Sequence, residues 1–199
     1  MPVPGNIGPS DAARYGWPGS PDDELVAAAT RIARHIVRAR SRIVAFLPVN
    51  GKEPLDDRLA PVLLRLAEAL IAFSDSSVAI VDTWRTWPWG EAVEWGQTAA
   101  HRSRWLRPRI LEVAPVPCGD ASAATVALQN ALAAPRPDGV LTTLVNLGGY
   151  AARGAVPAAL GLADAAVLVV SLRRTRRRAV ADVAEHVQGG KLLGAILIG

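Results

Sequence analysis

Cysteine, lysine and tyrosine are scarce in this chain of 199 residues. The single cysteine, Cys118, excludes an internal disulfide and is typical of a protein from a reducing cytoplasm. Lys52 and Lys191 are the only lysines, so arginine supplies most of the positive charge. The net charge of +4 is modest for this length and does not by itself predict nucleic-acid binding. Tyr15 and Tyr150 are the only tyrosines, which excludes a tyrosine cluster in the last part of the sequence.

A long uninterrupted hydrophobic run is also missing. The longest apolar stretch, residues 155–172, is interrupted by Asp164 and contains Pro157 and Gly161, which predicts a helix followed by a strand rather than a membrane span. The first few residues include neither the basic region nor the apolar core of a signal peptide. We therefore expect a cytoplasmic protein whose association with a membrane is indirect.

The composition is that of a globular protein, since half of the residues are apolar and a fifth are charged. Residues 1–20 carry Pro, Gly and Ser without periodicity, and we expect them to form a flexible tail. Residues 21–199 are then expected to form a single domain.

Short apolar segments alternate with amphipathic ones along this domain. The alternation predicts an α/β fold in which a doubly wound, mostly parallel sheet has helices on both faces, as in a three-layer sandwich. Expected strands cover residues 42–47, 78–83, 110–113, 140–147, 166–172 and 193–198. Expected helices cover residues 22–40, 58–73, 122–134, 156–162 and 175–187, and a further helix is expected from Gly90 onward.

The segment after the first expected strand lies where a nucleotide-binding fold has its phosphate loop, but it lacks the residues of one. Such a loop reads G-x-x-x-x-G-K-[ST], because backbone N–H groups must converge on the phosphates while a lysine neutralises them. Here Gly51 and Lys52 are followed by Pro54, Leu55 and Asp56. Proline removes one N–H donor, and an acid at the helix start occupies the position of an anion. A surface turn is favoured over an anion nest at Gly51 and Lys52.

Four segments together resemble a known family. They are Arg31-x-x-Arg34 in the first helix, the degenerate loop just described, residues 81–88, and residues 162–175. They resemble the deviant-Walker, MinD/ParA-type P-loop ATPases, and within these the bacterial tyrosine autokinases of capsule and exopolysaccharide synthesis. The resemblance spans roughly residues 22–199 and implies a P-loop NTPase-like fold.

The positions that bind nucleotide and magnesium in that family are changed here. In the loop, the family's Gly, Lys and Ser positions hold proline, leucine and aspartate. Asp82 matches the first acid of the family's I-D-x-D-x-R-x-P motif, whereas Trp84 replaces the second. The acid that ends the central strand in the family is Asn146 here. Asp82 is either a remnant metal ligand or, in the favoured interpretation, a strand-end residue that caps or hydrogen-bonds the loop.

Phosphoryl transfer depends on positioning and charge neutralisation rather than on covalent chemistry by the protein. Losing the loop lysine, the magnesium ligand and the second acid together removes most of that mechanism. We therefore expect a pseudo-kinase, or pseudo-ATPase, with no catalytic residue, no metal site and no cofactor.

The resemblance implies a role in exopolysaccharide biosynthesis and export. We expect the chain to bind cytoplasmic segments of an inner-membrane chain-length or co-polymerase protein, and to be peripheral at that membrane through its partner. Arg31 and Arg34 match the E-x-x-R-x-x-R helix through which such kinases form rings, although Ala28 replaces the Glu. They are therefore candidates for partner contact and for a homo-oligomer. The alternative is a MinD/ParA-like positioning or partition protein that binds membrane or nucleic acid through its basic helix, and a third interpretation is an enzyme with residual nucleotide binding.

Five tryptophans occur within residues 84–105, where we expect the carboxyl edge of the sheet. They are Trp84, Trp87, Trp89, Trp95 and Trp105. Three interpretations are open: a partner-binding patch, a surface for sugar or lipid, or a small core that fills the vacated nucleotide pocket.

Five arginines surround the start of the last expected helix and form a further candidate partner-binding surface. They are Arg173, Arg174, Arg176, Arg177 and Arg178. Basic side chains at a helix N-terminus oppose the helix dipole unless something acidic pairs with them. Two interpretations are therefore open: docking of acidic lipid, nucleic acid or an acidic partner, and a solvated helix start.

Overall fold

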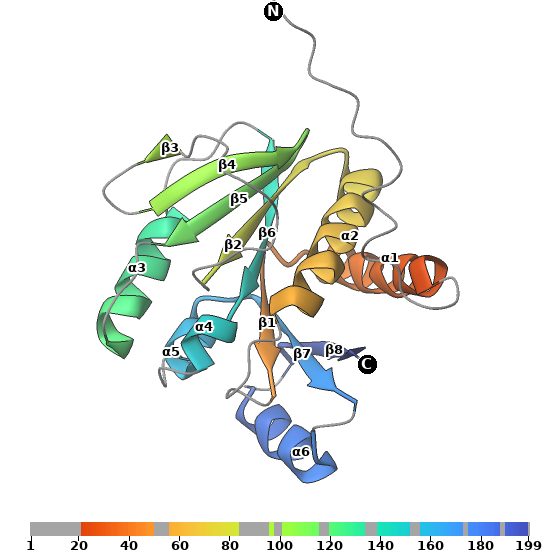
Figure 1. Ribbon diagram of the computed structural model, residues 1–199, viewed down its shortest axis with the longest axis vertical. Coiled ribbons are helices and arrows are strands. Elements are labelled where there is room, and N and C mark those ends of the chain that lie inside the picture. The colour runs from red at the N-terminus through yellow and green to blue at the C-terminus, as the bar shows by residue number, and fades with distance from the viewer. Residues whose placement is uncertain are drawn as a thin grey trace, which may run out of the picture.

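The computed structural model describes residues 21–49, 56–83, 96–97, 101–115, 120–133, 139–151, 156–172, 175–187 and 190–198. In these ranges the backbone forms one sheet of eight strands in the order β3-β4-β5-β2-β6-β1-β7-β8 (Figure 1). The strands are β1 (Ile43–Pro48), β2 (Ser77–Asp82), β3 (Gly96–Gln97), β4 (His101–Arg107), β5 (Ile110–Pro115), β6 (Val140–Asn146), β7 (Ala165–Ser171) and β8 (Leu192–Ile198). The helices are α1 (Pro21–Ala39), α2 (Asp56–Ser74), α3 (Ala121–Ala133), α4 (Gly148–Ala151), α5 (Val156–Gly161) and α6 (Arg177–His186).

Most of the sheet is parallel. The strands from β5 through β2, β6, β1 and β7 to β8 all run in one direction. Only β4, which pairs with β5, and the short β3, which pairs with β4, form antiparallel ladders within the described ranges. Parallel neighbours need crossover connections, which the helices supply. The predicted fold class, an α/β fold with a mostly parallel sheet, is confirmed.

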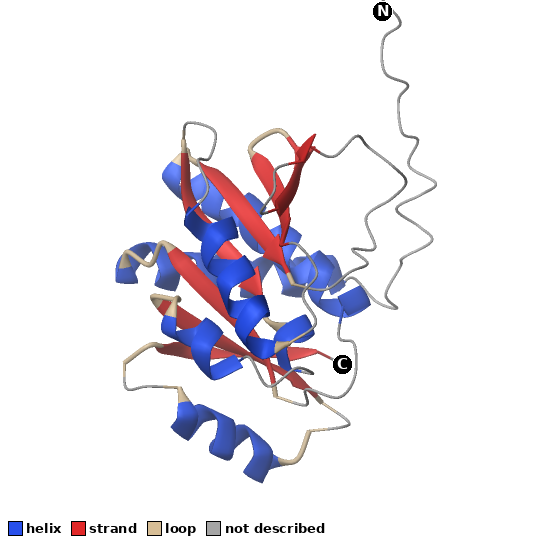
Figure 2. Cartoon of the chain, turned by 90° about the vertical axis from the view of Figure 1, so that its left-hand side faces the viewer, coloured by secondary structure: helices blue, strands red, loops and turns tan. Residues whose placement is uncertain are grey.

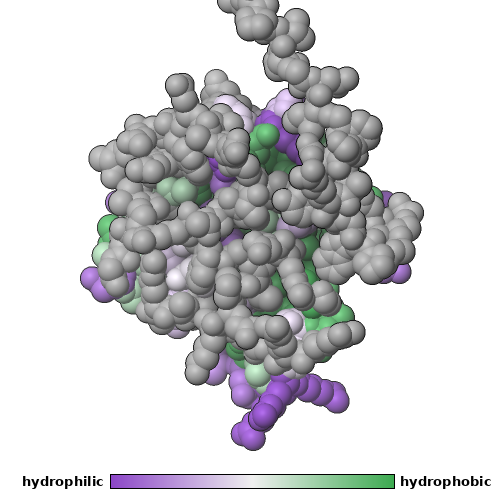
Figure 3. Space-filling model, viewed as in Figure 1, coloured by the Kyte–Doolittle hydropathy of each residue, from purple (hydrophilic) through white to green (hydrophobic). Residues whose placement is uncertain are grey.

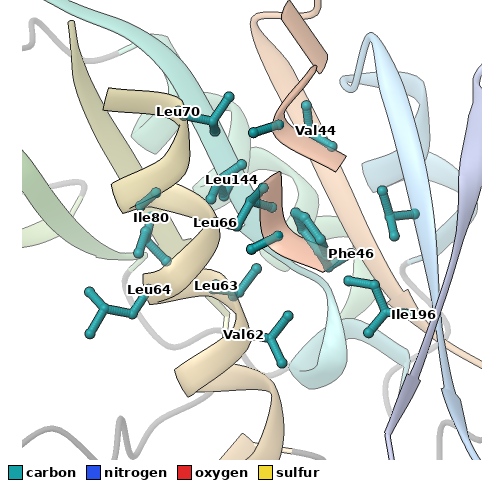
Figure 4. Close-up of a cluster of buried hydrophobic side chains, with 14 of the residues drawn as sticks. Val44, Phe46, Val62, Leu63, Leu64, Leu66, Leu70, Ile80, Leu144 and Ile196 are labelled. Carbon is teal, nitrogen blue, oxygen red and sulfur yellow. The ribbon is translucent and has the colours of Figure 1, made fainter. Parts of the chain in front are cut away.

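Helices cover both faces of the sheet (Figure 2). On one face, α1 and α2 enclose the largest apolar cluster, in which Leu66 of α2 packs with Val44 and Phe46 of β1 (Figure 4). On the other face, Ala45 joins a second cluster with residues of α3, α4 and α5. Successive residues of β1 thus point to opposite faces, and both faces are buried, as the uninterrupted apolar sequence of this strand predicts.

The prediction of a helix from Gly90 onward is wrong, because the structure has strands β3 and β4 in the part of this segment that it describes. Along β4, Arg104 is buried, Trp105 is exposed and Leu106 packs against the apolar cluster of α1 and α2. This alternation has the period of a strand. Because an arginine occupies one of the inward positions, the hydrophobic pattern of the sequence does not reveal this strand.

Two side chains connect the amino ends of the strands on the β1 side of the sheet. Asp164, just before β7, accepts hydrogen bonds at Oδ2 from the N–H groups of Arg42 and Ile43, each 2.8 Å long. Lys191, just before β8, donates from Nζ to the carbonyl oxygen of Ala163 at 2.9 Å. Strands β1, β7 and β8 are therefore joined at this edge by side chains as well as by their ladders.

Candidate functional site

The candidate site lies at the carboxyl ends of β1, β2 and β6. Asp82, the last residue of β2, is in register with Asn146, the last residue of β6, and Asn146 is in register with Phe46 of β1. In open α/β sheets, ligands bind at this edge, beyond the carboxyl ends of the strands. The topology therefore brings Asp82 and Asn146, two of the residues singled out in the sequence, into adjacent positions.

These two side chains contact each other directly. The Nδ2 atom of Asn146 donates a hydrogen bond to Oδ1 of Asp82 at 3.1 Å, and the N–H of Gly148 donates to Oδ1 of Asn146 at 2.9 Å. A carboxylate only accepts and a backbone N–H only donates, so these neighbours fix the orientation of the amide. Asp82 and Asn146 are each 2% exposed. The contact is therefore a buried connection between two neighbouring strand ends.

The backbone around this pair is also closely packed. The Oγ1 atom of Thr83 donates to the carbonyl oxygen of Asn146 at 2.6 Å. A Cβ atom added to Gly149 would lie 2.2 Å from the carbonyl oxygen of Thr83, closer than real Cβ contacts allow. Glycine is thus required where the start of α4 passes the end of β2, and this contact leaves no space between them.

Asp82 lies at the end of its strand and accepts a hydrogen bond from Asn146. Residues 50–55, which contain the loop, lie outside the described residues, so its contact with the loop stays a prediction. Among the described residues, no group of three or more His, Cys, Asp or Glu side chains is placed to hold a metal ion.

Most of the other residues proposed for this site lie outside the described residues. Those without a described position are Gly51, Lys52, Pro54, Leu55, Trp84, Trp87, Trp89, Trp95, Arg173 and Arg174. Asp56 is the first residue of α2, but its side chain is not among those described. The roles assigned to these residues stay predictions.

Trp105 does not lie at the carboxyl edge of the sheet, where the tryptophans were expected from the sequence. It lies opposite Leu111, near the start of β5, so it is at the amino half of the parallel sheet, away from Asp82 and Asn146. The reason is that β4 runs antiparallel and returns the chain toward the amino edge. Trp105 is 46% exposed and belongs to the surface of the outer strands.

The candidate oligomer residues Arg31 and Arg34 are exposed on α1, on a different part of the molecule from the strand ends. The guanidinium carbon of Arg34 lies 5.6 Å from the ring centroid of Phe73 in α2, a distance at which a cation is attracted to the ring face. Arg34 therefore contributes to the contact between α1 and α2.

The described arginines of the basic segment, Arg176, Arg177 and Arg178, are exposed at the start of α6. Arg176 is the N-cap residue, and its side chain makes no capping hydrogen bond. Hydrophilic side chains gather at the lower end of the molecule, where α6 lies (Figure 3). This surface follows the carboxyl end of β7, which is two strands away from β6 in the sheet.

The sequence interpretation missed a buried ion pair between neighbouring strands. The Nε atom of Arg104 in β4 donates to Oε2 of Glu112 in β5, and Oε1 of Glu112 is buried without a hydrogen-bond partner among the described residues. Burial raises the pKa of Glu112, and the hydrogen bond and charge of Arg104 lower it. A glutamate in the middle of the apolar strand segment at residues 110–113 was the available signal.

These features define a class of fold, an α/β domain with a mostly parallel sheet between two layers of helices. No protein-family model and no curated protein matches the sequence. Among solved structures, the chain is similar to the "BceF Tyrosine Kinase Domain", with a TM-score of 0.53 and 12% identity over 88% of this chain and 76% of that one. It also matches a ParA family ATPase from Chlorobium tepidum, with a TM-score of 0.47 and 13% identity over 78% of this chain and 73% of that one. The first likeness shows a shared fold.

No helix in the described ranges is both long enough and apolar enough to cross a bilayer.

Proposed function

We propose that this chain is a catalytically inactive relative of the bacterial tyrosine autokinases, which acts through contacts with other proteins. It binds cytoplasmic segments of an inner-membrane co-polymerase protein and regulates exopolysaccharide biosynthesis and export. This partner holds it peripherally at the inner membrane. The fold shared with a tyrosine kinase domain supports the kinase-like part of the proposal. The polysaccharide role rests on the sequence resemblance of residues 81–88 and 162–175.

The hydrogen bond between Asn146 and Asp82 is the observation that carries the proposal. Phosphoryl transfer needs a magnesium ion beside the phosphates, and magnesium takes oxygen ligands in a strict octahedral geometry. The amide of Asn146 has no negative charge to hold the ion, and its NH₂ group points at the carboxylate of Asp82. Two strand-end positions that the resemblance assigns to acids are thus occupied by an acid and an amide that are hydrogen-bonded to each other.

The loop sequence gives independent support. Pro54, Leu55 and Asp56 stand where the family has the glycine, lysine and serine that hold the phosphates. Each change removes a donor or a positive charge or adds a negative one, so all three oppose the binding of a triphosphate.

Nucleotide binding tests the inactive state. The purified chain is titrated calorimetrically with ATP and with ADP in the presence of magnesium, and is incubated with γ-labelled ATP. We expect no saturable binding at micromolar nucleotide and no label on the protein. The variant Asn146→Asp should stay inactive, because the loop positions are changed as well. Tight ATP–magnesium binding or autophosphorylation by the unmodified chain contradicts the proposal.

Partner binding tests the second part. Immobilised cytoplasmic segments of a two-span co-polymerase from the same genome should retain the chain, and the charge reversal Arg31→Glu with Arg34→Glu should reduce retention. Circular dichroism checks that the variant is folded, since Arg34 also contacts Phe73. A chain that such segments do not retain, with or without the substitutions, would not be the regulator proposed here.

A second candidate function has one observation in its favour. Arg176, Arg177 and Arg178 form an exposed basic surface on α6, as a MinD/ParA-like positioning or partition protein would need for binding membrane or nucleic acid. Binding of the chain to DNA and to anionic liposomes is measured over a range of salt. A steep decrease of affinity with salt supports this function, and no binding at low salt excludes it.

A further inference from the structure

Strand β8 is the last strand of the sheet order, so one of its edges carries backbone N–H and C=O groups without a strand partner among the described residues. Natural edge strands are usually protected by charged residues, proline or a bulge. The seven residues of β8, Leu192–Ile198, include no charged residue and no proline. A register shift occurs at its amino end, beside Gly194, and the remaining residues pair regularly with β7.

The face of β8 on the α6 side is apolar and uncovered. Leu197 pairs with Val170, which packs in the cluster beneath α6, whereas Ile196 packs on the opposite face under α1. Side chains alternate along a strand, so Leu197 points to the α6 side. It is 61% exposed, and Leu172, whose N–H donates to the carbonyl oxygen of Ile198 at 2.9 Å, is 57% exposed.

The charges of α6 are divided between its two ends. The helix connects the carboxyl end of β7 to the amino end of β8, so it runs antiparallel to both strands. It begins with the exposed Arg177 and Arg178, and the exposed Asp182 and Glu185 follow toward its end. One end of the β8 edge is therefore flanked by positive charge and the other by negative charge.

We propose that β8 pairs antiparallel with β8 of a second copy, so that two chains form one continuous sheet about a two-fold axis. The axis places the basic start of each α6 on the same side as the acidic end of the other. For α6 of both copies to lie on the same face of the joined sheet, the two-fold axis must pass between the two copies of one residue, and not between two successive residues. The reason is that residues directly opposite each other in an antiparallel pair point to the same face. With Ile196 on the axis, each exposed Leu197 lies opposite Ala195 of the second copy, a large residue against a small one. The proposal is independent of the proposed function.

A second copy fits this edge better than a lipid surface does. A bilayer has no partners for the unpaired N–H and C=O groups of an edge strand, whereas an antiparallel strand bonds to them. The two-fold arrangement also supplies charges of opposite sign to both ends of α6, which a uniformly anionic surface does not do.

Sedimentation velocity and light scattering on the chain test the proposal over a range of protein concentrations. We expect a dimer of twice 21.0 kDa at high micromolar concentration. Leu197→Lys should weaken dimerisation by about a hundredfold, since each copy loses a leucine that the dimer would bury. The matched control is Leu141→Lys, because Leu141 on β6 is 62% exposed and lies away from β8; this variant should dimerise normally. A chain that stays monomeric, or a dimer that Leu197→Lys leaves intact, overturns the proposal.

Two further sets of variants test the geometry of the pairing. Reversing Arg177 and Arg178 to Glu should weaken the dimer, and reversing Asp182 and Glu185 to Arg in the same chain should restore it. In a Cys118→Ser background, Ile196→Cys should form a disulfide-linked dimer on oxidation, because residues opposite each other on the axis have Cα atoms about 5 Å apart. Leu192→Cys should not, since its two copies lie about 27 Å apart. Equal cross-linking of both cysteine variants contradicts this register.

Discussion

The ion pair between Arg104 and Glu112 allows a quantitative test of the packing between β4 and β5. Both side chains are buried, at 5% and 0% exposure, and the second carboxylate oxygen of Glu112 has no hydrogen-bond partner in the part of the chain that the structure describes. Replacing Arg104 by methionine keeps an extended side chain but leaves the carboxylate without its cation. Removing one partner of a buried pair costs about 3–5 kcal/mol. That is a large fraction of the roughly 5–15 kcal/mol by which domains are stable.

The cost should depend on pH in a defined direction. Burial raises the pKa of Glu112 and Arg104 lowers it. Because its pKa is higher in the folded protein than in the unfolded chain, the stabilising contribution is complete below the unfolded pKa and is lost as pH rises through the folded pKa. Without Arg104 the folded pKa rises further. The variant should then lose about 1.4 kcal/mol per pH unit over a wider range than the unmodified chain.

Urea unfolding at several pH values between about 5 and 8 measures both effects. Arg104→Met should be strongly destabilised, whereas Arg104→Met with Glu112→Leu should recover most of the loss, because no buried charge remains. The double variant is also the control for lost packing area. If Arg104→Met costs less than about 1 kcal/mol, or if its stability does not fall with pH in this range, the reasoning about an unpartnered carboxylate is refuted.

Three further predictions are tested by substitutions, each measured by urea or thermal unfolding. Gly149→Ala should cost more than about 2 kcal/mol, because its Cβ would clash with backbone, while Gly161→Ala, with no atom within 4 Å of its Cβ, should change stability by less than about 1 kcal/mol; equal effects would contradict the close contact. Asp164→Ala should cost about 1–3 kcal/mol, because two backbone N–H groups lose their acceptor, and Asp164→Asn, which keeps one oxygen, should cost less; similar losses for both would show that the bonds are unimportant. Asn146→Asp should cost about 2–4 kcal/mol at neutral pH through repulsion with Asp82, and less in acid where the carboxyls are protonated; a neutral-pH stability equal to that of the unmodified chain would contradict the buried contact.

The sheet and most of its helices could be predicted because local patterns specify them. Strands such as β1 and β7 are apolar on both faces, as buried parallel strands must be. Their nearly continuous apolar sequences therefore predict them. Strand β4 could not be found in the same way. Its inward position is held by Arg104, whose partner Glu112 becomes adjacent only after β5 has formed. The glutamate is visible as an exception within the apolar β5, but nothing within β4 itself indicates that Arg104 points inward.

The candidate site shows a similar division. A parallel sheet places the carboxyl ends of β2 and β6 at one edge, so a shared edge for Asp82 and Asn146 could be expected from the sequence, whereas the pairing of the two strands is a finding of the structure. Their direct hydrogen bond could not, because it depends on side-chain rotamers and on the N–H of Gly148, which fixes the amide. The sequence identified the replaced acid but not what the amide does instead.

The side chains that join strand ends have a consequence for motion within the sheet. Asp164 connects the region before β7 to the start of β1 at one edge, and Asn146 connects β6 to β2 at the opposite edge. Sliding of one central strand along its neighbour would break such bonds as well as the ladder. The central strands are therefore expected to be rigid and to show very slow amide hydrogen exchange, and larger movements should be confined to the elements at the margins of the sheet.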